Sequence, residues 1–552
     1  MVYKQNIDKD MKLFEAIFSM FTMNFYKPVY NFIVLQSKSF RDLYVQTAKN
    51  YNLLNNFVEL FGKNVTIGLY AENSFNYIAW FLAAILKNVN LYLIPSSLEN
   101  TSILKLLIDG NINVLLVSDK TEKIVDYFPK MKIIPTVKLI ANIDTNIILY
   151  ERTMYRQSLE LDEDEEVIFN KDPHMVFNKP IRSLRQRFIS IVYESENSIY
   201  PRILNFTNES IYNGLMILAS AETKLPILEN KRFYTDLNYS ESIIYTLLWP
   251  LYCGASIDDS MDTADVILLS NEAFDWIIEE TLKDIFNIPI IGKKMLLGVP
   301  ALQIVARWLL KRKLRKLNHE SILLLNPRLS NSIFKVVSKA KNISCLCGMP
   351  EANHIFAVND FKVKGYNKPN NVGDMYSQVQ FLINYDNRLR FDAGSLLISS
   401  NHLCEYESDK KYIDVRLHSE VKQMKDKSFH LYIYGHMSNI IINEFDESFN
   451  LETIEAIVRN NFLFKEVLFY PDRNQFYLLI YPNIYFASLA KFSLLDFKNY
   501  VKIYKDDINN YVKMNLIKDV KLIFEEFSKY ESKTLKRIFY KFEDNHLLNP
   551  KL

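Results

Sequence analysis

The chain has 552 residues, of which 49% are hydrophobic and 24% are charged, a composition typical of a globular protein with several domains and a large core. Its 66 Lys and Arg residues are nearly balanced by 64 Asp and Glu residues, so we expect no nucleic-acid partner. Four cysteines exclude a disulfide scaffold, and no run approaches the ~18 apolar residues of a membrane span. Because the start of the chain lacks the layout of a signal peptide, we expect a cytoplasmic protein.

The stretch from 65 to 119 alternates between short apolar runs and helical patterns. The expected elements are a strand at 65–71, a helix at 75–87, a strand at 91–94, a helix at 101–109 and a strand at 113–117. Asn73 or Ser74 is able to cap the first helix, which is apolar on most of its faces. This order predicts a parallel, doubly wound sheet layered with helices in a large α/β domain.

The middle of the chain is more varied. Residues 151–185 are polar and contain an acidic run at 162–166, which is typical of a solvated loop. Mixed α/β patterning then continues from 186 to 436, and residues 307–317 form a basic amphipathic helix pattern. Such a helix is able to make peripheral contact with a membrane, although a charged outer face on a packed helix is the commoner explanation.

After residue 436 the pattern changes to that of a compact α+β domain. Residues 451–460 have the pattern of a short amphipathic helix, and apolar runs at 467–470 and 476–480 flank a good turn sequence at 471–474. We expect helices from about 493 onward. The predicted domains are therefore 1–436, with layered mixed sheets and helices, and a small C-terminal domain at 437–552.

Standard motifs of catalysis and nucleotide binding are missing from the sequence. The chain has 12 glycines, about 2% of its residues, against about 7% in an average protein. Loops that cradle phosphates need glycine, because its backbone reaches conformations that bring N–H groups close to a phosphate. Cys345 and Cys347 have no second Cys or His pair at zinc spacing, so we expect buried free thiols.

The order of several segments nevertheless resembles the adenylate-forming enzymes, the acyl- and aryl-CoA synthetases, over roughly residues 35–545. The matching segments are FRDLY (40–44), NVTIGLYAENSFNY (64–77), AAILKNVNLYLIP (83–95), NVLLVSD (113–119), GMPE (348–351), VGD (372–374), GSLLI (394–398), YGH (434–436), LETIE (451–455) and YESKTLKR (530–537). The nearest branch is that of the bacterial long-chain fatty-acid–CoA ligases. The resemblance implies a large N-terminal AMP-binding domain, a small mobile C-terminal domain and a two-step reaction. In the first step a carboxylate attacks the α-phosphate of ATP with Mg²⁺, giving an acyl-adenylate and pyrophosphate, and in the second the CoA thiol takes the acyl group and releases AMP.

The phosphate loop of this family, Thr-Ser-Gly-Thr-Thr-Gly-x-Pro-Lys-Gly, matches residues 194–203 (ESENSIYPRI). Ser195, Ser198 and Arg202 are the implied nucleotide-binding residues, with Arg202 in place of the family's Lys. All three glycines are replaced, and two glutamates stand where a polyphosphate should lie. A carboxylate at ~4 Å from a phosphate charge costs about 4 kcal/mol at an effective dielectric constant near 20. The substitutions alone are able to abolish useful affinity for ATP.

The family's Tyr-Gly-Met-Thr-Glu motif corresponds to residues 348–351. Gly348 is retained and is implied to line the nucleotide site, and Glu351 is the implied catalytic Mg²⁺ ligand. Pro350 replaces a Thr that contacts phosphate, and it has neither a hydroxyl nor an N–H to donate. A surface or paired carboxylate remains the plainer interpretation of Glu351.

The remaining family positions are also altered. The Asp that binds ribose falls on Val421, with Glu420 one place away and Asp414 further upstream. The His of a substrate-binding segment falls on Tyr239 by a looser alignment. The hinge Arg becomes His436.

The catalytic Lys of the family falls on Thr534. Lys533 stands beside it and is the candidate catalytic lysine if the alignment shifts by one residue. Otherwise the basic tail is a solvated helix end.

These substitutions lead to one principal interpretation and two alternatives. We expect an acyl-CoA synthetase-like protein with a degraded ATP site, a pseudoenzyme or a homologue of altered activity. The first alternative is an active ATP-dependent ligase that joins an acid to a thiol and forms AMP. The second is a non-catalytic protein that binds acyl groups or a partner. The implied ligand is a carboxylic acid, such as a long-chain fatty acid, and the sequence leaves the oligomeric state open.

Overall fold

The computed structural model divides the chain into two compact units. The first comprises Met1–Leu268, Met349–Ile355 and Ser400–Lys411, and the second comprises Leu269–Gly348, Phe356–Ser399 and Tyr412–Leu552. The structure describes residues 2–31, 37–98, 100–127, 136–151, 177, 188–193, 201–220, 224–240, 242–296, 299–314, 317–326, 331–339, 342–351, 354–360, 370–376, 379–386, 389, 393–399, 412–423, 429–443, 445–472, 475–493, 501 and 505–523. The predicted boundary between 436 and 437 stays a prediction.

The first unit contains a mixed sheet with the strand order β7-β6-β5-β3-β4-β8-β9. Its strands are β3 (Thr66–Tyr70), β4 (Asn90–Ile94), β5 (Val114–Val117), β6 (Leu139–Asn142), β7 (Ile148–Glu151), β8 (Ile189–Tyr193) and β9 (Arg202–Phe206). The inner strands are parallel, and β7 and β9 are antiparallel edges. The predicted doubly wound arrangement of β3, β4 and β5 is confirmed.

The helices of the first unit are α1 (Val2–Asn24), α2 (Phe40–Phe61), α3 (Phe75–Lys87), α4 (Asn100–Asp109), α7 (Asn208–Ala219) and α8 (Trp249–Tyr252). The predicted start of α3 is confirmed: the Ser74 hydroxyl accepts a hydrogen bond from the Tyr77 N–H, and Asn88 ends the helix in the left-handed conformation. Nearly all of α3 is buried, and it packs against α2.

A second group of strands in this unit has the order β12-β10-β11-β1-β2. The strands are β1 (Pro28–Asn31), β2 (Lys38–Ser39), β10 (Arg232–Thr235), β11 (Ser256–Asp258) and β12 (Val266–Leu269). All pairs are parallel except β1 with β2. A single turn of π-helix, Ile244–Leu248, leads into α8.

The second unit combines a parallel strand pair with antiparallel strands. The parallel pair is β13 (Ser321–Leu325) with β14 (Ile343–Met349). The antiparallel strands, in the order β17-β18-β19-β20-β16-β15, are β15 (His354–Asp360), β16 (Asn371–Met375), β17 (Phe381–Tyr385), β18 (Ala393–Ser399), β19 (Tyr412–Gln423) and β20 (Phe429–His436). The helices before β15 are α9 (Asn271–Phe286), α10 (Pro289–Leu296), α11 (Pro300–Leu314) and α12 (Asn331–Val337). The predicted basic helix at 307–317 therefore belongs to a longer helix that starts at Pro300.

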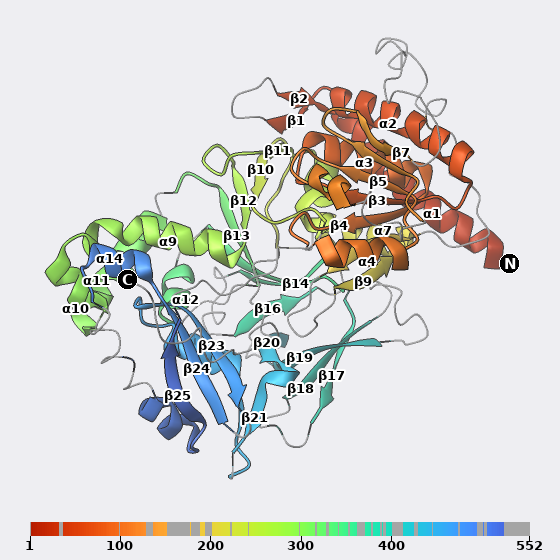
Figure 1. The fold of residues 1–552 in the computed structure, drawn as a ribbon. Helices are drawn as coiled ribbons and strands as arrows, with labels where there is room; N and C mark the ends of the chain where they lie inside the picture. Colours follow the sequence, from red (N-terminus) through yellow and green to blue (C-terminus); the bar gives the residue numbers. More distant parts are fainter. Residues whose placement is uncertain are drawn as a thin grey trace. The chain divides into compact units, whose positions relative to one another are not determined.

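The C-terminal part of this unit is an α+β arrangement, drawn in blue in Figure 1. Its elements are β21 (Ile440–Ile442), β22 (Ser448–Asn450), α13 (Leu451–Val458), β23 (Phe464–Asp472), β24 (Gln475–Pro482), α14 (Ile484–Leu489) and β25 (Ile517–Leu522). The predicted helix and hairpin are confirmed by α13 and the antiparallel pair β23–β24. The expected helices after about 493 include a helix at 505–512, which the structure shows, but the sequence did not predict β25, which joins β24 as a parallel strand.

Two further sequence predictions concern a membrane span and the acidic run. No helix among the described residues is long and apolar enough to cross a membrane. The acidic run at 162–166 lies outside the described residues. The predicted class is confirmed: a sheet-rich α/β N-terminal part is followed by a smaller α+β C-terminal part.

Candidate functional site

The segment that resembles a phosphate loop joins two antiparallel strands of the first unit. Tyr193 ends β8 and pairs with Arg202, the first residue of β9. Ser195 and Ser198 lie outside the described residues. Arg202 is therefore the one predicted member of this loop whose side chain the structure places.

Arg202 and Glu351 lie together, although they come from distant parts of the sequence. The Arg202 guanidinium is 3.7 Å from a Glu351 carboxylate oxygen. The Arg202 side chain is 50% exposed and that of Glu351 is 20% exposed. Burial raises the pKa of the Glu351 carboxyl, and the positive charge of Arg202 opposes that rise. The cation and the carboxylate that survive from two separate motifs thus partly neutralise each other.

Glu351 follows the end of β14 by two residues, and Pro350 occupies the turn between them. A proline offers no N–H to a phosphate. A nucleotide-bound Mg²⁺ usually takes one or two carboxylates together with phosphate oxygens. Glu351 is able to supply one such oxygen, and the metal would then share this carboxylate with Arg202. In the described part of the chain, no group of three or more His, Cys, Asp or Glu residues is placed to hold a metal ion. The donors described at this pair therefore fit Mg²⁺ poorly.

Gly348 lies in the second unit, where Asn326 fixes its backbone. The Gly348 N–H donates to Asn326 Oδ1 at 3.0 Å, and Asn326 Nδ2 donates to the Gly348 carbonyl at 2.7 Å. Asn326 ends β13 with φ of +43°, a conformation in which Asn is enriched. The sequence analysis did not identify Asn326. The only sequence signal for this residue is its position directly after the apolar run SILLL.

The predicted hinge at His436 is fastened to the start of α13. The His436 N–H donates to Glu452 Oε1 at 2.9 Å, and Asn450 Nδ2 donates to the His436 carbonyl at 3.1 Å. The Thr453 hydroxyl donates to the Tyr434 carbonyl at 3.0 Å. These bonds connect β20 with α13 of the C-terminal part. His436 therefore marks a defined junction, and its role as a hinge stays a prediction.

Glu420 is the buried carboxylate closest in sequence to the altered ribose position. Its side chain accepts a hydrogen bond from the Tyr434 hydroxyl at 2.7 Å and pairs with Lys422 at 2.7 Å. Val421 points to the opposite face of β19, because successive side chains alternate along a strand. His418, on the same face as Glu420, is 7% exposed. Burial lowers its pKa to about 4, against the opposing effect of Glu420.

Tyr239, at the altered substrate-segment position, is held in the first unit. Its N–H donates to Asn73 Oδ1 at 2.9 Å, and Asn73 Nδ2 donates to the Leu237 carbonyl at 2.8 Å. The Tyr239 ring is buried 5.8 Å from that of Tyr77. Burial raises the pKa of its hydroxyl well above the usual value. The residue therefore stays neutral and is unable to act as a base near neutral pH.

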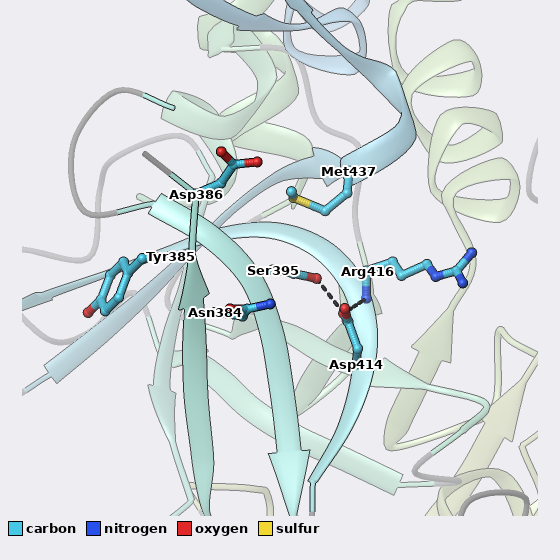
Figure 2. A pocket seen from close by; sticks show the side chains of 7 residues that line it. All are labelled: Asn384, Tyr385, Asp386, Ser395, Asp414, Arg416 and Met437. Carbon is cyan, nitrogen blue, oxygen red and sulfur yellow. Dashed lines mark hydrogen bonds between the residues drawn. The ribbon is translucent and has the colours of Figure 1, made fainter. Parts of the chain in front are cut away.

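A cavity of about 470 Å³ lies in the second unit, and its lining includes Met437, the residue after His436 (Figure 2). Its lining residues are Asn384, Tyr385, Asp386, Ser395, Asp414, Arg416 and Met437. The Asp414 carboxylate accepts hydrogen bonds from the Ser395 hydroxyl and, at 2.8 Å, from the Arg416 N–H. The Arg416 side chain points away from the Asp414 carboxylate in Figure 2. Of the residues that the sequence analysis named, the cavity lining contains Asp414, the carboxylate upstream of the altered ribose position. Lys533, the candidate catalytic lysine, lies outside the described residues.

The sequence matches no protein-family model and no curated protein. Solved structures nevertheless share its fold. The anthranilate CoA ligase solved with anthranoyl-AMP has a TM-score of 0.68 and 12% identity, over 95% of this chain and 95% of the ligase. The o-succinylbenzoate CoA synthetase of Bacillus subtilis, solved with AMP, has a TM-score of 0.67 and 12% identity, over 96% and 98% of the two chains. A fatty acyl CoA synthetase of Mycobacterium tuberculosis has a TM-score of 0.58 and 14% identity, over 96% and 97%.

The likeness covers nearly the whole length of this chain and of each of these structures. The protein therefore has the fold of the acyl- and aryl-CoA ligases, as the order of its sequence segments predicted. At these identities the likeness establishes the fold alone, and function depends on the residues at the site.

Proposed function

We propose that this protein is an acyl-CoA synthetase-like protein whose ATP site is degraded, and that it binds a carboxylic acid or acyl ligand without adenylating it. The observation that carries the proposal is the Arg202–Glu351 pair at 3.7 Å. Adenylation requires positive charge and donors aimed at the phosphates. The described cation at this position is instead partly neutralised by a carboxylate.

The neighbouring substitutions support the same conclusion. Pro350 has no donor where the family has a Thr, and the loop sequence at 194–203 contains glutamates and no glycine. Glu420, the carboxylate nearest the ribose position, is already bonded to Tyr434 and Lys422. A phosphate at Arg202 would have to compete with Glu351, and a ribose at Glu420 would have to compete with Tyr434 and Lys422. Either competition would weaken the affinity.

The proposed ligand is a long-chain fatty acid or its CoA thioester. The sequence motifs resemble those of the long-chain branch. An apolar acyl chain is favourably removed from water when it enters an apolar pocket. We propose that the protein acts in the cytoplasm.

An active adenylating ligase is the second candidate. The observation in its favour is that Arg202 and Glu351, which the family alignment assigned to phosphate and Mg²⁺, lie within 4 Å of each other. For this candidate ATP, Mg²⁺ and CoA would be required. By the family resemblance, Ser195, Ser198 and Gly348 would be further nucleotide-binding residues, and Lys533 would be the catalytic lysine.

Two measurements on the purified full chain separate the candidates. The proposal predicts that a fluorescent fatty acid or acyl-CoA binds without ATP, and that no fatty acid in a panel promotes exchange of pyrophosphate into ATP. Fatty-acid-dependent exchange would overturn the proposal in favour of the active ligase. Failure of every acyl ligand to bind would contradict the acyl-binding part and leave a protein partner as the remaining function.

A further inference from the structure

The segment from 285 to 319 is strongly basic in a chain that is otherwise slightly acidic. It contains eight Lys and Arg residues and no Asp or Glu, whereas the entire chain has a net charge of only +2. Helices α10 and α11 lie within this segment and pack against each other and against α9. The positive charge is therefore concentrated on one part of the second unit.

Helix α11 exposes apolar residues as well as basic ones. Its packed side is formed by residues such as Ala306, Leu310 and Leu314, which are fully buried. On other faces Ile304 is 62% exposed, Val305 44% and Trp308 56%. Packing within the unit explains why the buried residues of α11 are apolar. It does not explain the exposed apolar residues, which remain in contact with water. Exposed branched and aromatic side chains at helical spacing are characteristic of a surface that binds an apolar partner.

The basic residues lie next to this apolar surface. Arg312 and Lys313 are exposed in the last turn of α11, and the Arg312 guanidinium lies 5.6 Å from the centre of the Trp308 ring. On α10, Ile290 is 72% exposed, and Lys294 is also exposed. Apolar side chains, a Trp and neighbouring cations are the residue types that favour the interface of a membrane, where acyl chains meet anionic headgroups.

We propose that the exposed face of α10 and α11 is a docking surface for an anionic lipid bilayer. Ile290, Ile304, Val305 and Trp308 would enter the headgroup region, while the basic residues contact lipid phosphates and carboxylates. Aliphatic side chains at the centre of the patch favour lipid over nucleic acid, which needs aromatic stacking and backbone contacts. The neighbouring helix α9 contains the acidic residues Glu279, Glu280 and Asp284. This docking surface is independent of the proposed function.

The test uses the full chain and sedimentation with vesicles of phosphatidylcholine, with or without phosphatidylserine. The wild type should bind vesicles that contain phosphatidylserine and bind pure phosphatidylcholine much more weakly. The combined variant Lys311→Gln, Arg312→Gln and Lys313→Gln should lose roughly fivefold in affinity for each charge removed. A matched control removes three exposed lysines of the first unit, Lys38, Lys120 and Lys123, and should bind like the wild type.

A second readout reports on the apolar residues. Trp80 and Trp249 are buried, whereas Trp276 and Trp308 are more than half exposed. In a Trp276→Phe background, anionic vesicles should shift the emission of Trp308 to shorter wavelength. Trp308→Ser should weaken vesicle binding while circular dichroism and the unfolding midpoint remain those of the wild type.

Several results would overturn the proposal. These are the absence of vesicle binding by folded wild type, equal binding by the basic-residue variant and its control, or no change in Trp308 emission. Self-association without vesicles that Trp308→Ser abolishes would identify a second copy as the occupant instead. Displacement from vesicles by an oligonucleotide that binds the same face more tightly would identify nucleic acid.

Discussion

Under the proposed function, the contact between Arg202 and Glu351 weakens the binding of a nucleotide at this pair. Each side chain has a charge suited to nucleotide binding, but at 3.7 Å each also reduces the field of the other. The pair is partly exposed, so its contribution to stability is small, about 0–1 kcal/mol. The more informative quantity is therefore the effect of this ion pair on the affinity for a ligand.

We predict that Glu351→Gln raises the affinity for ATP or pyrophosphate, because Arg202 loses its neutralising partner. An increase of about fivefold corresponds to ~1 kcal/mol, the upper range for an exposed ion pair. Titration calorimetry with and without Mg²⁺ measures the change. Glu229→Gln is the control, because it removes a comparable ion pair with Lys27 at 3.2 Å. A clear loss of Mg²⁺-dependent ATP affinity in Glu351→Gln would instead mean that Glu351 holds the metal of a working site.

His418 gives a second prediction at the residue scale, on pH. Its pKa falls from about 6.5 in an unfolded chain to about 4 in the folded protein, because burial disfavours the charged form. Above pH ~6.5 both states are neutral at this residue and the stability is complete. As the pH falls from ~6.5 toward ~4, the unfolded state takes up the proton first, and up to about 3 kcal/mol of stability is lost.

The His418→Phe variant should therefore lose less stability in acid than the wild type, over that same range. Urea unfolding at a series of pH values measures the difference. His319→Phe, at a position that is only half-buried, should keep the acid sensitivity of the wild type. Identical pH profiles for the wild type and His418→Phe would show that the folded protein does not suppress the charge of His418.

At the scale of elements, the junction between β20 and α13 depends on one glycine. Gly435 has φ of +139°, and a Cβ atom there would lie 2.5 Å from Asn450 Oδ1 and 2.9 Å from Glu452 Cδ. Any other residue would be strained by its backbone and would push against two side chains that bond His436. The described conformation of the junction therefore requires a glycine at this position.

We predict that Gly435→Ala lowers the free energy of unfolding by about 2–4 kcal/mol, from strain and steric overlap together. Gly62→Ala is the comparison, because Gly62 has φ of +93° but a Cβ atom added there would have no neighbour within 4 Å, and this variant should cost only about 1–2 kcal/mol. Denaturant unfolding gives both values. Equal losses would show that overlap with Asn450 and Glu452 adds nothing.

The C-terminal helix α14 packs on α9 within the second unit. The Phe486 and Phe286 rings are stacked with centres 3.9 Å apart, and both are buried. Glu279 on α9 accepts a hydrogen bond from Asn483 at 3.2 Å and lies 3.7 Å from Lys465. Apolar and polar contacts together therefore hold the C-terminal part to this helix.

We predict that Phe486→Ala destabilises the second unit by about 3–5 kcal/mol, because a large buried ring leaves a cavity. Tyr485→Ala changes the neighbouring side chain, which is 39% exposed, and should cost less than about 1 kcal/mol. Thermal and urea unfolding measure the two effects. A loss below about 1 kcal/mol for Phe486→Ala would contradict the packing described.

Elements with strong local patterns were predictable, and those defined by distant contacts were not. Helix α3 was placed from its apolar run and its Ser74 cap, and β23 and β24 from two apolar runs around a turn. The β25 segment, IKDVKL, is half polar, and becomes a strand because β24 offers its edge. The role of Asn326 was likewise not predictable from local sequence, because its hydrogen-bond partner Gly348 belongs to another strand.

At the scale of the whole molecule, the order of weak motifs predicted the fold over almost the full length of the chain. The same motifs could not specify the site, because the distance between Arg202 and Glu351 depends on how β9 and the end of β14 are brought together. The scarcity of glycine, by contrast, is visible in the sequence and is consistent with a fold retained after its phosphate loop has changed. The central claim is that this fold no longer binds ATP usefully.

Titration calorimetry of the full chain with ATP and Mg²⁺ tests that claim most directly. A ligand that binds the native state also stabilises it by RT ln(1 + [L]/Kd), so a thermal shift in the same buffer gives an independent check. We predict no saturable heat and no rise in Tm at millimolar ATP. Saturable binding with a Kd well below the millimolar range, together with a higher Tm, would contradict the account and identify a working nucleotide site.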